Sequence, residues 1–270
     1  MLTATFIHAQ GVGFSTERAL WQKGVRSWDL YREQASSLGL SRRTRDSLSA
    51  TVDASVAALE AHDAKYFARE LPSGEHWRAA RTFTHLGFLD IETDGGMGPG
   101  STTVIGLSDG LDCRIYVRGR DLDEFVADCQ RFDGFVTFFG AGFDLPMLRR
   151  EYPVLERIFR ERLHIDLCPA LRKLGYRGGL KSIEQQLDIH RVPEAEGLDG
   201  LDAVRLWKAY RRGGRGSEEA LDQLLAYNRE DVVNMVSLLE FSLPRLRTAC
   251  GFEDILAGSA PVLDEAVATA

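Results

Sequence analysis

Four acidic residues in three short motifs are the residues of this chain best suited to chemistry. Asp90 and Glu92 lie in GFLDIET, Asp144 follows in GAGFDLP, and Asp231 lies in YNREDVV. Each stands beside an apolar run or at a helix start, where ionised groups are normally avoided. Carboxylates that a fold brings together need a positive charge between them, and divalent metal ions supply it. The motifs therefore predict a metal site suited to phosphoryl-transfer chemistry, and more specifically to a nuclease.

Asp90 and Glu92 are separated by one residue in a predicted strand, so both side chains project from the same face. Leu89 and Ile91 then point into the core. Such a pair alone is more often a solvated strand end. The buried run before it places the pair at the carboxyl end of the strand, where ligands often bind in open α/β sheets.

The other two acids lie at predicted helices. Asp144 follows a Gly-Ala-Gly turn and precedes Pro146, which indicates a helix N-terminus. Taken alone, helix capping is the commoner role for such a residue. Tyr227 and Asp231 have i, i+4 spacing on a helix and share one face, and we expect Asn228 to lie off it.

The elements that must position these acids follow a recognisable order. Residues 1–80 are predicted to form a small helical module, and residues 246–270 a flexible tail. Between them, residues 81–245 alternate between strand and helix periodicity. Strands are predicted at 84–93, 101–108, 113–119, 133–140 and 161–168, and helices at 121–132, 144–152, 180–187, 200–210 and 217–241. This is the order of an α/β, ribonuclease H-like fold, with a mixed β-sheet flanked by helices.

The composition is that of a soluble globular protein, with 44% hydrophobic and 27% charged residues among 270. No apolar run approaches about 20 residues, so we predict no transmembrane helix. The N-terminus lacks the pattern of a secretory signal. Four separated cysteines with no CxxC pair indicate reduced thiols and a cytoplasmic protein. The net charge of −7 does not decide for or against nucleic acid, because the acidic cluster contributes to it.

In order and spacing, the three acidic motifs resemble those of the DEDD exonuclease superfamily, which includes polymerase proofreading domains. Tyr227, four residues before Asp231, resembles the DEDDy branch, since the histidine branch would need His where this chain has Ala226. From about residue 4 to residue 243 the chain also resembles the YprB-type ribonuclease H-like family. The segments that carry this likeness are TFIHAQGVGFSTERALWQKGV, EHWR, HIDL and GLKSIEQQLDI.

The resemblance implies that two Mg²⁺ or Mn²⁺ ions, which prefer oxygen ligands, are held by Asp90, Glu92, Asp144 and Asp231. It also implies that Tyr227 orients the attacking water. The chain departs from the proofreading enzymes at Phe139, where they usually carry an asparagine that supports the site or contacts the substrate.

Further candidates concern nucleic-acid contact. Lys181 is a candidate phosphate ligand, although a surface lysine is commoner, and Asp166 is expected to cap a helix rather than border the site. Two basic, glycine-rich segments, 172–181 and 208–216, suit a phosphate backbone, and the second contains Arg211 and Arg212.

The segment around Gly11 and Gly13 resembles a helix-hairpin-helix element. In that motif, glycine amides approach a phosphate. A single copy is equally compatible with a packing module.

The sequence is compatible with three functions. The leading prediction is a two-metal 3′–5′ exonuclease acting on single-stranded ends of DNA or RNA. The alternatives are a non-catalytic or weakly active nucleic-acid-binding protein, which Phe139 favours, and a structure-selective endonuclease, since ribonuclease H-like folds host several nuclease types.

Overall fold

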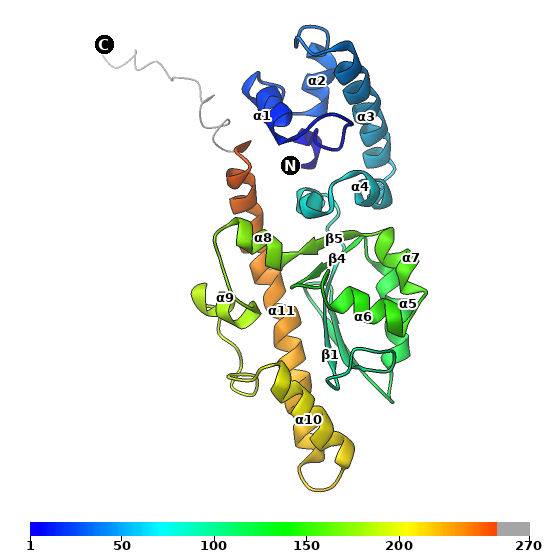
Figure 1. The fold of residues 1–270 in the computed structure, drawn as a ribbon, viewed down its shortest axis with the longest axis vertical. Coiled ribbons are helices and arrows are strands. Elements are labelled where there is room, and N and C mark those ends of the chain that lie inside the picture. Colours follow the sequence, from blue (N-terminus) through cyan, green and yellow to red (C-terminus); the bar gives the residue numbers. More distant parts are fainter. Residues whose placement is uncertain (253–270) are drawn as a thin grey trace, which may run out of the picture.

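The centre of the molecule is a five-stranded sheet in the order β3-β2-β1-β4-β5 (Figure 1). It is seen in a computed structural model that describes residues 1–252. The antiparallel neighbours are β1 (Leu86–Thr93), β2 (Thr102–Ser108) and β3 (Cys113–Val117), whereas β4 (Gly134–Thr137) and β5 (Leu163–Asp166) run parallel to β1. All five predicted strands are present. The fourth ends at Thr137, three residues earlier than predicted, because Phe139 takes a left-handed backbone conformation with φ 63°.

Helices cover both faces of the sheet. One face packs on α5 (Phe125–Asp128), α6 (Asp144–Glu151) and α7 (Leu155–Arg160), and it carries Leu89 and Ile91. The other face carries Phe88 and packs on α8 (Leu167–Lys173), α9 (Leu180–Gln186) and α11 (Ser217–Ala249), with α10 (Gly200–Arg212) beside α11. Because side chains alternate along β1, the acids at positions 90 and 92 share one face, as the sequence predicts. In the structure this face is the one that packs on α11. The sheet order and its two helical layers confirm the ribonuclease H-like fold.

The N-terminal region is helical, as expected. It consists of α1 (Phe14–Gln22), α2 (Trp28–Gln34), α3 (Arg42–Glu60) and α4 (Ala64–Glu70), with 3-10 helices at Leu2–Ala4 and Ser73–Ala79. Before Gly11, residues 1–10 form only the short 3-10 helix and turns. The helix-hairpin-helix resemblance is therefore met only in its second helix, α1.

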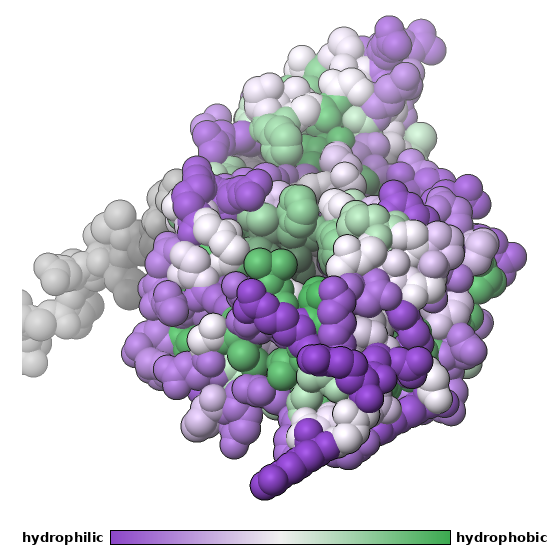
Figure 2. Space-filling view, turned by 60° about the horizontal axis from the view of Figure 1, so that its bottom comes forward, coloured by the Kyte–Doolittle hydropathy of each residue, from purple (hydrophilic) through white to green (hydrophobic). Residues whose placement is uncertain are grey.

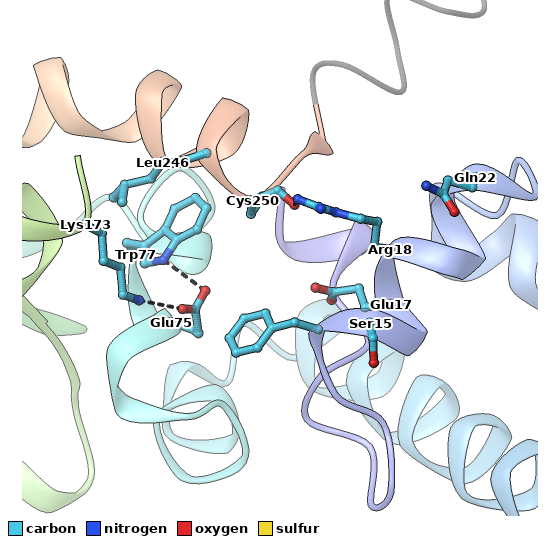
Figure 3. A pocket seen from close by; sticks show the side chains of 11 residues that line it. Ser15, Glu17, Arg18, Gln22, Glu75, Trp77, Lys173, Leu246 and Cys250 are labelled. Carbon is cyan, nitrogen blue, oxygen red and sulfur yellow. Dashed lines mark hydrogen bonds and ion pairs between the residues drawn. The ribbon is translucent and has the colours of Figure 1, made fainter. Parts of the chain in front are cut away.

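A chain of ion pairs around the buried Arg78 joins this helical region to α8, which packs on the sheet. Arg78 donates from Nη1 to Glu17 at 2.9 Å and from Nε to Glu75 at 2.8 Å. Glu75 in turn accepts hydrogen bonds from Trp77, at 3.1 Å, and from Lys173 on α8, at 2.8 Å (Figure 3). Leu163 of β5 also packs in the apolar cluster of the N-terminal helices. The N-terminal helices are thus tied to the sheet by charge and by packing, and a domain boundary near residue 80 stays a prediction.

The last helix runs further than the sequence suggests. Helix α11 continues through Pro244 to Ala249, so residues 246–249 belong to a helix and not to the predicted tail. Burial of Leu243 and Leu246 stabilises this last stretch despite the missing proline N–H. Phe252 is also placed: it is buried, and its ring packs edge-on against Trp21 of α1 with the ring centroids 5.1 Å apart, so the predicted tail is wrong for this stretch too. Residues 253–270 of the predicted tail lie outside the described residues. All four cysteine thiols are free. None of the helices in residues 1–252 combines the length and apolarity that a membrane span requires.

Candidate active site

Three of the four predicted acids meet where α11 crosses β1. Asp90, Glu92 and Asp231 each offer one carboxylate oxygen, and these oxygens all lie within 4.8 Å of one another. The helix can come this close because Gly106 of β2 pairs with Asp90 and has no side chain. A Cβ atom there would lie 2.6 Å from Val232 Cγ2 of α11. Glycine at this position is therefore a packing requirement of the site.

Asp144 lies beside this group and does not cap its helix, so the capping interpretation is wrong. It is the first residue of α6 and the N-cap is Phe143, which makes no side-chain capping bond. Instead, Asp144 Oδ1 accepts a hydrogen bond from the Ile91 N–H at 3.1 Å. That amide is available because the pairing of β1 with β4 ends at Phe88. Since Ile91 stands between Asp90 and Glu92, the bond places the fourth carboxylate next to the other three.

The buried carboxylates repel one another and would be stabilised by added positive charge. Burial, and then the charges of Asp231 and Asp144, raise the pKa values of Asp90 and Glu92 well above their usual range. Burial likewise raises the pKa of Asp144 to about 7. Without cations, the folded protein therefore relieves the repulsion by keeping protons. Because the donor atoms are all carboxylate oxygens, the site fits hard divalent cations such as Mg²⁺ or Mn²⁺.

Tyr227 borders the acids, as the i, i+4 spacing predicts, and Lys181 holds it. Lys181 Nζ donates to the Tyr227 hydroxyl at 2.7 Å and also to the Leu198 carbonyl. Burial, together with the charges of Asp231 and Glu92, raises the pKa of Tyr227 far above its ordinary value, so the phenol stays protonated. Burial lowers the pKa of the Lys181 ammonium. Lys181 is therefore a half-buried member of the site and not a surface lysine.

The sequence-based interpretation missed two residues that contact the acids. Asn228, expected off the acidic face of its helix, is fully buried and donates from Nδ2 to Asp90 Oδ2 at 2.9 Å. Its i, i−3 spacing from Asp231 could have revealed it. Arg191 donates to Asp231, and also to both carboxylate oxygens of Glu184 at 2.6 and 2.7 Å. Arg191 lies in the connection between α9 and α10, where no periodic pattern points to it.

The remaining predicted nucleic-acid contacts lie on other elements than the acids. Arg211 and Arg212, at the end of α10, line a pocket of ≈ 610 Å³ together with Trp207, Lys208 and Asp94. Gly11 and Gly13 are exposed in the segment before α1, at the opposite end of the molecule from α10 (Figure 1). Asp166 caps α8, as expected, by accepting from the Cys168 N–H at 3.1 Å.

Comparison with known proteins identifies the superfamily of the region that holds these residues. The model of the RNase H superfamily matches residues 87–242, a span that includes all four acids and Tyr227. No curated protein and no solved structure matches the chain. The ribonuclease H-like fold implies a nucleic-acid substrate, and the acidic cluster is of the kind that holds divalent metals in such nucleases. The matched span covers more than half of the 270 residues, and the chain belongs to the RNase H superfamily.

Proposed function

We propose that this protein is a metal-dependent 3′–5′ exonuclease that hydrolyses phosphodiester bonds at single-stranded ends of nucleic acid. The observation that carries the proposal is the meeting of Asp90, Glu92 and Asp231 within 4.8 Å. Asp144 is hydrogen-bonded to the strand residue between the first two. Tyr227 stands beside them on the same helix as Asp231.

The four carboxylates would hold two Mg²⁺ or Mn²⁺ ions. When bound, such ions lower the pKa of a coordinated water and stabilise the charge that develops on the leaving oxygen. The protein itself orients the ligands. The Ile91 amide holds Asp144, the Asn228 amide holds Asp90, and Arg191 holds Asp231. Each of these three carboxylates keeps a second oxygen for a cation, because the bonds engage one oxygen of each.

Tyr227 is suited to positioning the attacking water. Its hydroxyl oxygen accepts a hydrogen bond from Lys181, so its own proton is free to point toward another acceptor. The raised pKa keeps this proton on the phenol at neutral pH, which excludes Tyr227 as a general base. Held by Lys181, the Tyr227 hydroxyl would position the water next to the carboxylates while the phenol stays protonated.

A labelled oligonucleotide distinguishes this proposal from its two alternatives. A single strand labelled at its 5′ end is incubated with Mg²⁺ or Mn²⁺, and the proposal predicts a ladder that shortens from the 3′ end. One internal cut would favour a structure-selective endonuclease, and binding without cleavage a non-catalytic protein. Asp90→Asn should abolish the ladder. The matched control is Asp222→Asn, an exposed aspartate on α11, which should behave as wild type.

A further inference from the structure

The loop after β4 carries an aromatic side chain in an unusual setting. Phe139 is 52% exposed and has φ 63°, in the left-handed region that bulky residues avoid. Residues kept in such a conformation persist where the surrounding structure over-determines them, and they cluster at ligand sites. The position therefore calls for an explanation beyond folding.

Two neighbours fix the Phe139 backbone and ring. Asp166 accepts hydrogen bonds from the N–H groups of Phe139, at 2.8 Å, and Ala141, at 3.1 Å. The ring lies against Gly142, where a Cβ atom would come within 2.7 Å of it. The exposed ring is therefore held in one place.

Phe139 forms one wall of a groove of ≈ 810 Å³ with basic residues at its edge. Arg177 Nη1 donates to the carbonyls of Arg172, at 2.6 Å, and Tyr176, at 2.9 Å, which anchors this guanidinium. Within residues 1–252, the exposed Arg172 side chain makes no hydrogen bond or ion pair. Seen from the α10 end, the surface has a hollow lined by apolar side chains among hydrophilic ones (Figure 2). The groove is lined by Phe138, Phe139, Cys168, Arg172, Arg177, Gly178, Gly179 and Leu180.

Residues that line the groove lie close along the chain to residues of the acidic site. Phe139 precedes Asp144 by five residues, and Leu180 is followed by Lys181, which is bonded to Tyr227. Both walls of the groove are thus followed along the chain by residues that border the carboxylates.

We infer that this groove binds the substrate strand, with one base stacked on Phe139 and backbone phosphates bound by Arg172 and Arg177. The inference rests on the proposed function, because it assigns the strand to the same site. An exposed, immobilised ring beside two arginines matches a nucleobase attached to phosphates. A free anion would leave the ring unused, and an apolar peptide would leave the arginines unused.

Binding of fluorescent single strands of DNA and RNA to the full-length protein tests the inference. Anisotropy is measured in EDTA, so that the strand is not hydrolysed. Phe139→Ala should weaken binding about 5- to 160-fold, the loss expected for one stacked base. Phe139→Trp should retain affinity. Arg172→Ala with Arg177→Ala should weaken binding and reduce the salt slope by about 1.4, since each phosphate contact on a single strand contributes about 0.7.

The controls are Phe14→Ala, at a phenylalanine that is 59% exposed on α1, and Arg43→Ala on α3. Both should bind as wild type. Phe139→Gly distinguishes a loss of base stacking from a loss of stability. It removes the ring, and glycine adopts the left-handed conformation without strain. We expect it to bind as weakly as Phe139→Ala without lowering the melting temperature.

The outcomes distinguish the groove from the nuclease activity. If Phe139→Ala and the double arginine variant bind as tightly as wild type, the groove is refuted, whatever the protein cleaves. If these variants lose affinity but the wild type cleaves no strand with Mg²⁺ or Mn²⁺, the groove stands and the exonuclease proposal fails.

Discussion

Replacing Asp144 by asparagine should stabilise the metal-free protein by an amount that grows with pH. Burial raises the pKa of this carboxyl from 3.8 to about 7, so the folded state binds its proton more tightly than the unfolded chain does. The stability that this proton contributes is complete below about pH 4 and is lost as the pH rises toward 7. Over this interval, each pH unit lowers the free energy of unfolding of the wild type by at most about 1.4 kcal/mol, which adds up to about 4 kcal/mol. Asparagine cannot ionise, and it can still accept the Ile91 hydrogen bond, so it avoids this loss.

Urea unfolding in EDTA between pH 4.5 and 7.5 measures the effect. The free energies of unfolding of wild type and Asp144→Asn should nearly coincide at the acid end, and the variant should be the more stable at pH 7. Asp222→Asn, an exposed change, should follow wild type throughout. With Mg²⁺ at 100 times its dissociation constant, wild type should gain about 2.7 kcal/mol and the variant less. A stability difference that is flat with pH, or missing at pH 7, would refute the reasoning.

Three further substitutions test individual contacts of the site. Tyr227→Phe removes only the hydroxyl, so we expect kcat to fall about 100-fold while strand affinity stays near that of wild type; an unchanged kcat would show that the water is positioned otherwise. Gly106→Ala forces a Cβ atom against α11, and thermal unfolding should show a loss of about 1–3 kcal/mol together with weaker Mg²⁺ binding by calorimetry. Arg191→Ala leaves the buried carboxylates of Glu184 and Asp231 uncompensated, so urea unfolding at pH 7 without metal should show a loss of about 3–5 kcal/mol. That loss should shrink as the pH falls, because the raised pKa of Asp231 lets a proton take the place of the guanidinium.

Lys181 and Phe139 show how interpretations based on residue type change when the fold is known. A lysine at a helix start is usually exposed, yet Lys181 is half-buried, because the Leu198 carbonyl and the Tyr227 hydroxyl both lie within its reach. Phe139 looked like the loss of a useful asparagine. In the fold it is an exposed ring held by Asp166, which suggests a substrate contact of a different kind.

Local geometry let the sequence determine much of the site by itself. The two-residue period of a strand places Asp90 and Glu92 on one face, and the helical period places Tyr227 beside Asp231. These relations need only the backbone conformation of one element, so they can be deduced from spacing. The five strands and their order along the chain could be predicted for the same reason.

The contacts between separate helices and strands follow only from the tertiary packing. Asp144 turns from a helix cap into a neighbour of the metal-binding acids because the edge of β1 leaves the Ile91 amide available, 53 positions away in the chain. Asn228 reaches Asp90 because α11 packs against the bare backbone of Gly106. Arg191 reaches Asp231 from an irregular connection that has no period of its own. Such contacts depend on how closely separate elements pack, and spacing along the chain carries no record of that distance.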